Sequence, residues 1–327
     1  MQGRAFVMRC IDTGQLSYYF REAGSGPLVL LIHGFPDLSL GWLHQIEALA
    51  MAGYHVVAPD MRGYGRTGGP AESSGYCMGN LVGDLVELVE GLGYQKAVLI
   101  GHDWGAAVSW QAALLRPDVF QAVMGMAVPF QPRRLHGPPT EVMSYLAQKH
   151  GEDELYLSAF ARPDAHLIMD EDPEQALRKM FWAFDGATPD HHQATGRIPE
   201  GQNFIDIISD EATLPPWMEA SHFEAYVEAF REGGFERPVH WYRRIDDNWS
   251  QTRWLQGQKI IVPAAFLVGE RDPVRRYAGQ HEAELADWLE DLRSVTIVPG
   301  AGHWVQQEKP EAVNEAILAF LWDLSLK

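Results

Sequence analysis

The feature that most constrains the fold of this chain is a repeated alternation of short apolar runs with longer amphipathic stretches. Such alternation is typical of a parallel sheet covered by helices on both faces. The expected strands are residues 28–32, 55–58, 96–100, 121–127, 264–268 and 294–298, and the expected helices are residues 39–52, 79–92, 104–116 and 309–324. A hairpin of less regular strands is expected over residues 5–22. The pattern therefore predicts a doubly wound α/β fold.

The alternation stops between residues 132 and 255. This stretch offers no convincing strand, but it contains helical segments interrupted by Pro and Gly, such as residues 173–185 and 217–232. We expect a helical insertion between two parts of one sheet. Residues 1–131 and 256–327 would then form one discontinuous core, and residues 132–255 a helical lid domain.

Charge and composition exclude several classes of function. Asp and Glu number 44 against 26 Lys and Arg, and the net charge of −18, without any basic run, makes nucleic acid an improbable partner. The longest apolar runs are strand-length, so no transmembrane segment is expected, and no export signal is visible, which favours a cytoplasmic location. Two cysteines, Cys10 and Cys77, support neither a disulfide framework nor a metal site. The oligomeric state is left open.

The segment GHDWG at residues 101–105 lies between an expected strand and an expected helix. It matches a nucleophile elbow, in which flanking glycines permit a tight strand-to-helix turn and expose the central side chain above the sheet. The usual central residue is Ser, whereas this chain has Asp103. A carboxylate at the first turn of a helix is also favourable as a cap, and the two roles are compatible.

The replacement of Ser by Asp103 changes the chemistry that is expected. A carboxylate is already ionised at neutral pH, so it attacks without a base. It can displace a leaving group at an sp³ carbon and become an ester of its own side chain. A second step must hydrolyse that ester, which requires a base that activates water and N–H donors for the oxyanion that forms on the Asp carboxyl.

Residues for this second step follow other strands. The segment HGFP at residues 33–36 occupies the position where this fold provides one oxyanion N–H, so we assign the backbone N–H groups of Phe35 and Trp104 to that role. His303 follows a late strand in a Gly-rich loop and is the expected general base. Asp272 would orient it, with Glu270 as the less favoured alternative. The resulting order of nucleophile, acid and His is that of α/β-hydrolases.

In these segments the chain resembles the α/β-hydrolase-fold epoxide hydrolases of the soluble type. HGFPDLSLGWLHQIEALAMAGYHVVAPDMRGYGRT at residues 33–67 and GHDWGAAVSW at residues 101–110 are similar to that family's core almost throughout, and GERDP at 269–273 and GAGHW at 300–304 extend the similarity to its second half. The resemblance implies an α/β-hydrolase fold with a mostly parallel central sheet, an inserted helical lid and no cofactor or metal. It also implies conversion of an epoxide and water to a vicinal diol through a hydroxyalkyl ester on Asp103.

The resemblance further points to two lid tyrosines that hydrogen-bond the epoxide oxygen. Tyr242 in FERPVHWYRRIDDNW and Tyr156 in ELYLSAFARPD match these positions. Tyr145 is the alternative to Tyr156, because Ala159 and Asp164 stand where aromatic and Gly residues are commoner. Ring opening generates an alkoxide, and a phenol with a pKa of about 10 can both stabilise and protonate it. The competing interpretation is that Tyr242 only packs the lid against the core.

A haloalkane or haloacid dehalogenase is the alternative enzyme, since such enzymes also resemble this core and use an elbow Asp. A halide needs side-chain N–H donors, typically a Trp after the nucleophile and an Asn after the HG pair. Trp104 is present, but the second position holds Phe35, which has no side-chain donor. Enzymes for small haloacids usually carry Arg where Trp104 stands.

Other interpretations have weaker support. A ligand receptor on a hydrolase fold would show a broken catalytic set, and an esterase would have Ser at the elbow. Residues 190–192, Asp-His-His, lack a third metal ligand at useful spacing, and GYGRTGG at 63–69 lacks the Lys-Ser/Thr pair of a P-loop.

The distribution of tryptophan indicates the kind of substrate. Five of the eleven tryptophans lie in the expected lid, namely Trp182, Trp217, Trp241, Trp249 and Trp254. Two more, Trp104 and Trp304, adjoin the proposed nucleophile and base. We expect an apolar, water-restricting pocket between lid and core, with Phe35, Trp104 and Trp304 contacting a small hydrophobic epoxide.

Overall fold

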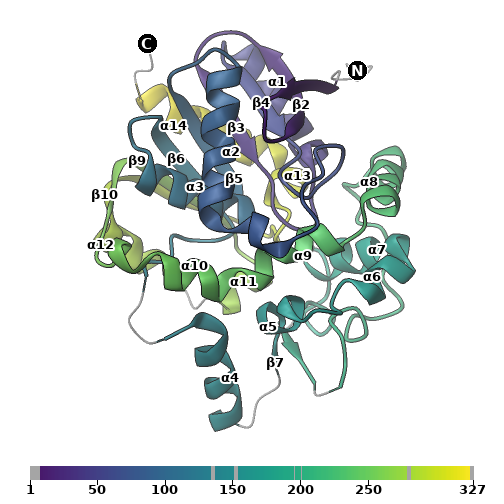
Figure 1. Ribbon diagram of the computed structural model, residues 1–327. Coiled ribbons are helices and arrows are strands. Elements are labelled where there is room, and N and C mark those ends of the chain that lie inside the picture. The colour runs from purple at the N-terminus through teal and green to yellow at the C-terminus, as the bar shows by residue number, and fades with distance from the viewer. Residues whose placement is uncertain are drawn as a thin grey trace.

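The computed structural model describes residues 8–133, 137–150, 154–194, 196–199, 201–277 and 281–324. Within these residues one large sheet has the strand order β1-β2-β4-β3-β5-β6-β9-β10 (Figure 1). Its strands are β1 (Met8–Asp12), β2 (Ser17–Gly24), β3 (Leu28–Ile32), β4 (His55–Pro59), β5 (Ala97–His102), β6 (Phe120–Met126), β9 (Ile260–Gly269) and β10 (Leu289–Val298). The β1-β2 and β2-β4 pairs are antiparallel, and all pairs from β4 to β10 are parallel.

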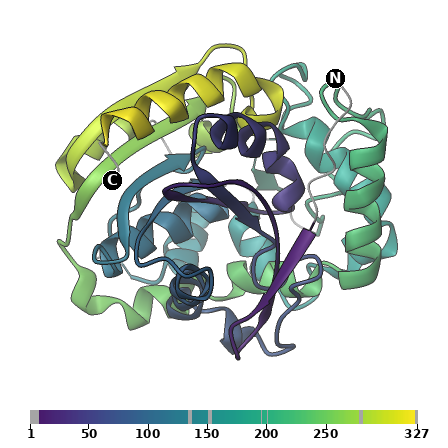
Figure 2. The same ribbon diagram turned by 90° about the horizontal axis from the view of Figure 1, so that it is seen from above.

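Helices cover both faces of this sheet, as the pattern of fully apolar strands predicts. The helices that flank the first strands and end the chain are α1 (Leu43–Met51), α2 (Met78–Gly91), α3 (Trp104–Leu115) and α14 (Pro310–Asp323). In β3, Leu28, Leu30 and Ile32 belong to the apolar cluster of α2 and α3, whereas Val29 and Leu31 belong to the cluster of α1 and α14. Figure 2 shows the yellow α14 beside α1 on one side of the sheet. Side chains that alternate along a strand therefore fill two separate cores.

The predicted strands and helices are confirmed, with shifts at their ends. The strand at 28–32 has the predicted bounds, while β9 and β10 begin before the predicted 264 and 294. The predicted helix 39–52 is divided into the 3₁₀ turn η1 (Ser39–Trp42) and α1. The predicted hairpin is formed by β1 and β2, and its residues 5–7 lie outside the described part of the chain.

The stretch between β6 and β9 is mainly helical and lies below and to the right of the sheet in Figure 1. Its helices are α4 (Pro139–His150), α5 (Tyr156–Ala161), α6 (Leu167–Glu171), α7 (Pro173–Ala183), α8 (Ala220–Gly233), α9 (Glu236–Arg243) and α10 (Ile245–Gln251). The expectation of no strand here is wrong at one place, because β7 (Glu154–Leu155) pairs antiparallel with β8 (Arg197–Ile198). Strands of two residues are too short to leave a period-two pattern in the sequence.

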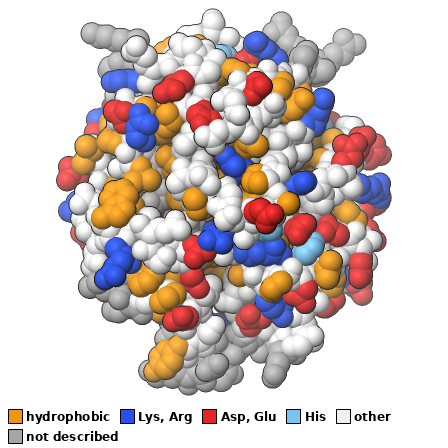
Figure 3. Space-filling model, in the orientation of Figure 1, with side chains coloured by type: hydrophobic (Ala, Val, Ile, Leu, Met, Phe, Trp, Pro, Cys, Tyr) orange, Lys and Arg blue, Asp and Glu red, His pale blue; other side chains and the backbone are white. Residues whose placement is uncertain are grey.

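The remaining elements are short. They are η2 (Ser73–Tyr76), η3 (Arg253–Leu255), α11 (Pro273–Tyr277), η4 (His281–Glu284), α12 (Leu285–Trp288) and α13 (Val305–Glu308). In the described part of the chain, none of the helices has the length and apolar character that crossing a membrane would require. Acidic and basic side chains are interspersed over the face that Figure 3 shows.

Parallel pairing decides where polar residues gather. The carboxyl ends of parallel strands meet at one edge of a sheet, and ligands in open α/β sheets bind outside that edge. The loops that follow β3, β5, β9 and β10 carry Phe35, Asp103, Asp272 and His303. The topology thus brings side chains that are far apart in the sequence to one edge.

Candidate active site

Asp103 occupies a tight turn between β5 and α3. Its φ of 53° lies in the left-handed region that non-glycine residues rarely adopt. The flanking glycines make this turn possible, because a Cβ on Gly101 would lie 2.2 Å from the carbonyl oxygen of Gly105, and a Cβ on Gly105 would lie 2.1 Å from that of Ile32. The strained turn presents the Asp103 carboxylate at the carboxyl edge of the sheet, and the side chain has few solvent contacts, with the residue 8% exposed.

Backbone N–H groups point at the Asp103 carboxylate. Phe35 donates to Oδ1 at 2.9 Å, and the N–H of Trp104 also hydrogen-bonds this side chain. Gly34 permits the approach, because a Cβ there would lie 2.3 Å from Oδ1. Burial raises the pKa of Asp103, while the charge of His303 and these N–H donors act to lower it. The two residues predicted to supply oxyanion donors therefore both face the carboxylate.

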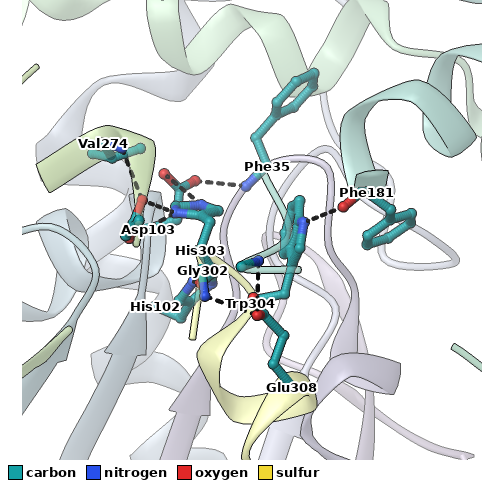
Figure 4. A network of polar contacts seen from close by, with 11 residues as sticks. Phe35, His102, Asp103, Phe181, Val274, Gly302, His303, Trp304 and Glu308 are labelled. Carbon is teal, nitrogen blue, oxygen red and sulfur yellow. Dashed lines mark hydrogen bonds and ion pairs between the residues drawn. The ribbon is translucent and has the colours of Figure 1, made fainter. Parts of the chain in front are cut away.

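His303 lies between two carboxylates (Figure 4). Its Nδ1 is 3.1 Å from Asp272 Oδ2, and its Nε2 is 3.7 Å from Asp103 Oδ2. Asp272 is fully buried and also accepts the N–H of Val274 at 2.8 Å. Burial alone would lower the pKa of His303. The charge and hydrogen bond of Asp272, and to a smaller extent the charge of Asp103, outweigh this effect and raise the pKa to about 9. The imidazole is therefore charged when Asp103 is ionised.

The alternative orienting acid, Glu270, has a different partner. It is exposed, and its Oε2 accepts the N–H of Gly300 at 2.9 Å. The structure brings Asp272, and not Glu270, into contact with the imidazole of His303.

The two expected lid tyrosines lie across the cavity from the nucleophile. Tyr156 is the first residue of α5 and Tyr242 lies in α9, and both line one cavity with Asp103. The ring of Phe160 packs between them, with centroids 6.0 Å from Tyr156 and 5.0 Å from Tyr242. Burial raises the pKa of both phenols, and the Asp103 charge raises it further. The alternative residue, Tyr145, is 62% exposed on α4.

The cavity that contains these groups is narrow and mostly apolar. Its volume is about 30 Å³. It is lined by Phe35, Pro36, Asp103, Tyr156, Phe160, Met180, Phe184, Phe204, Tyr242, Val274, His303 and Trp304. The expected substrate contacts Phe35 and Trp304 are among them, while the indole of Trp104 packs edge-on against Tyr242 with centroids 5.1 Å apart.

Sequence reasoning missed several residues of this site. Asp37 is fully buried, its Oδ1 accepts the hydroxyl of Tyr226 and its Oδ2 accepts the side chain of Gln306. Burial raises the pKa of Asp37 to about 7. The position of Asp37 directly after the HGFP segment is the sequence feature that could have identified it. The lining rings of Phe160, Phe184 and Phe204 carry no such signal, because they come from separate parts of the insertion.

The geometry supports one type of chemistry. A buried carboxylate is held by N–H donors on one oxygen, a His–Asp pair lies 3.7 Å from its other oxygen, and two phenols line the same mostly apolar cavity. Such a site can attack an sp³ carbon, protonate the departing oxygen and hydrolyse the resulting ester.

Comparisons with known proteins agree with this geometry. The family described as the alpha/beta hydrolase fold matches residues 27–310. The chain is 38% identical over 324 residues to Epoxide hydrolase A of Mycobacterium tuberculosis, with 98% of each chain covered. An epoxide hydrolase from an endophytic Streptomyces superposes with a TM-score of 0.92 at 34% identity, covering 99% of this chain and 97% of that one. Epoxide Hydrolase A from Mycobacterium thermoresistibile gives a TM-score of 0.89 at 40% identity, covering 98% and 99%.

Proposed function

Because the chain belongs to the α/β-hydrolase-fold epoxide hydrolases, we propose that it converts a small hydrophobic epoxide and water to a vicinal diol through a hydroxyalkyl ester on Asp103. The observation that carries this proposal is the surroundings of Asp103, whose Oδ1 accepts the N–H of Phe35 at 2.9 Å while its Oδ2 lies 3.7 Å from His303 Nε2. The two lid phenols complete the set, since a carboxylate nucleophile, a base and proton donors are what this reaction needs.

In the first step, Oδ2 of Asp103 attacks the less hindered epoxide carbon. The C–O bond of the ring breaks, and the oxygen takes one proton from Tyr156 or Tyr242 while the other phenol hydrogen-bonds it, so one phenolate remains. The raised pKa of both phenols keeps them protonated at neutral pH, so they can donate. The positive imidazolium of His303 keeps the buried Asp103 ionised in the free enzyme.

In the second step, His303 removes a proton from water, which attacks the carboxyl carbon of Asp103. Esterification has removed the Asp103 charge that raises the pKa of His303, so the imidazolium can return its proton to the phenolate and become the neutral base of this step. Asp272 orients the ring and stabilises the imidazolium that forms. The oxyanion develops on Oδ1, which the N–H groups of Phe35 and Trp104 already face. The ester C–O bond then breaks as the imidazolium of His303 protonates the departing oxygen to release the diol, and the proton left on the Asp103 carboxyl returns to the imidazole.

We also propose that residues 132–255 act as a lid over a core of residues 1–131 and 256–327. The lid supplies Tyr156, Tyr242 and half of the apolar lining residues. A mostly apolar cavity strengthens the electrostatic contacts inside it and limits access of bulk water. A halide leaving group has less support, because the ring of Phe35 takes the place of a side-chain donor.

The test is diol release from a panel of terminal epoxides, trans-disubstituted epoxides and haloalkanes. We expect diol from at least one epoxide class, no halide release, and no turnover by Asp103→Ala. Halide release without diol, or full activity of Asp103→Ala, would refute the proposal.

A further inference from the structure

The loop that carries His303 is fastened to the lid by its backbone. The N–H of His303 donates to the carbonyl oxygen of Phe184 at 2.9 Å. The carboxyl of Glu308, the last residue of α13, joins the same two segments, because its Oε2 accepts the N–H of Gly302 at 2.8 Å and that of Gly186 at 3.0 Å. Figure 4 shows the contact between Gly302 and Glu308 below the imidazole.

The two glycines allow the backbones of lid and loop to touch. A Cβ on Gly302 would lie 2.3 Å from the nitrogen of Gly186, and a Cβ on Gly186 would lie 2.4 Å from the carbonyl oxygen of Gly300. Both N–H groups end on a single carboxyl oxygen of Glu308. That oxygen therefore joins the two segments beside the direct bond between His303 and Phe184.

A second carboxyl lies beside Glu308. The Asp185 side chain is within hydrogen-bonding reach of it, and Asp185 Oδ1 also accepts the N–H of Ala187 at 3.1 Å. The buried Oε1 of Glu308 receives no hydrogen bond from the described residues. Two carboxyls can hydrogen-bond only if one keeps its proton, and burial followed by the Asp185 charge raises the pKa of Glu308 to about 8. The raised pKa favours the carboxylic acid form of Glu308, which accepts both N–H bonds on Oε2 and has a proton to share with Asp185.

We propose that Glu308 is a positioning residue for the general base: by holding Gly302 against Gly186 of the lid, it fixes the imidazole of His303 at the distance from Asp103 that ester hydrolysis requires. This inference rests on the proposed function, because it takes His303 as the base of the second step. Asp272 fixes the ring from the core side, and Glu308 fixes its backbone from the lid side. Loss of this second support leaves the loop free to shift, and a shift of about 1 Å can cost on the order of 10²-fold in rate.

The two half-reactions separate positioning from general stability. Alkylation uses Asp103 and the lid phenols, whereas hydrolysis alone uses the base. Glu308→Ala is expected to slow hydrolysis of the ester by about 10- to 100-fold and to change alkylation by less than about 3-fold. In Glu308→Gln, the amide oxygen accepts the same two N–H bonds and the amide nitrogen donates to Asp185, so hydrolysis should be restored. Glu311→Ala, an exposed glutamate at the start of α14, is the matched control.

The pH profile of hydrolysis provides a readout that a structural role would not produce. Above the pKa of Glu308, wild type acquires a second carboxylate beside Asp185 and loses the shared proton, so the hydrolysis rate should decline. The charge of Asp185 in the lid acts on the pKa of Glu308. The charge of Glu308 in turn acts on the pKa of His303, in the loop that precedes α13. Deprotonation of His303 favours the base step, so it does not cause a decline. Glu308→Gln has no such titration and should lack the decline.

The experiment is a single-turnover measurement of both half-reactions, with a terminal epoxide that wild type converts to diol. Failure of wild type to form diol from any epoxide of the panel would refute the proposed function. Diol formation by wild type, with unchanged hydrolysis in Glu308→Ala, would refute the role of Glu308 alone. Equal slowing of both half-reactions in Glu308→Ala, without rescue by Glu308→Gln, would also refute it, because that result indicates general damage.

Discussion

Replacement of His303 by Gln should separate the two chemical steps by trapping the ester on Asp103. Gln is neutral and is not a base, although its amide can still donate a hydrogen bond to Asp272. His303 Nε2 lies 3.7 Å from Asp103 Oδ2, so the imidazole faces the carboxyl group whose ester it must help to hydrolyse. A base placed in this way contributes roughly 10²- to 10⁴-fold, or about 2.7 to 5.4 kcal/mol at about 1.36 kcal/mol per tenfold. More than about 99% of the variant should then accumulate as ester if alkylation is unimpaired.

The substitution of His303 also affects the ionisation of Asp103, and the choice of pH corrects for this effect. The charge of His303 lowers the pKa of Asp103, so its removal leaves more of the buried carboxyl protonated at neutral pH. The measurement is therefore made on the alkaline side, where Asp103 is ionised in both proteins. Intact-mass spectrometry should show one added substrate mass, and peptide mapping should locate it on Asp103. His44→Gln, at an exposed histidine of α1, is the control that should not accumulate an adduct. Diol release from His303→Gln at the wild-type rate, or an adduct elsewhere, would refute the reasoning.

Three further predictions follow from the cavity. Tyr242→Phe should slow alkylation by about 10²-fold with little change in binding, because one phenol remains for the developing alkoxide; an unchanged rate in stopped-flow measurements would favour a packing role. Burial raises the pKa of Asp103 above 3.8, and the nucleophile works only when ionised, so alkylation should decline as pH falls through a midpoint above that value; a midpoint at or below it would contradict this. Phe204→Ala should raise the rate ratio of bulky to small epoxides by roughly 10-fold or more, while Phe223→Ala, outside the cavity lining, should leave the ratio unchanged; equal ratios in both variants would exclude Phe204 as a size limit.

The core of this protein was predictable because its inner strands β3, β4, β5 and β6 are buried on both faces. The run at 28–32 is fully buried, so its bounds could be read from the sequence. The starts of the last two strands could not, because positions such as Ile261 in β9 are exposed and Pro263 interrupts the pattern. Residues that follow parallel strands meet at one edge, which is why Asp103, Asp272 and His303 could be proposed together.

The cavity lining within residues 132–255 was less predictable, because the residues that form it come from separate segments without a common period. Phe204 reaches the site from an irregular stretch, where its ring lies 5.1 Å from that of Phe160 and 5.9 Å from that of Phe184. Glu308 was hidden for another reason, since its importance depends on a backbone contact between Gly186 and Gly302 that only the tertiary structure creates.

The most direct test of the central claim is the fate of labelled oxygen in a single turnover in H₂¹⁸O with enzyme in excess over epoxide. In the proposed mechanism, the diol takes its new oxygen from Oδ2 of Asp103, and the oxygen of water enters the carboxyl group. This mechanism predicts ¹⁸O in the peptide that contains Asp103 and no ¹⁸O in the diol of the first turnover. Label found directly in that diol, with none on Asp103, would mean that water attacks the epoxide itself and would contradict the account.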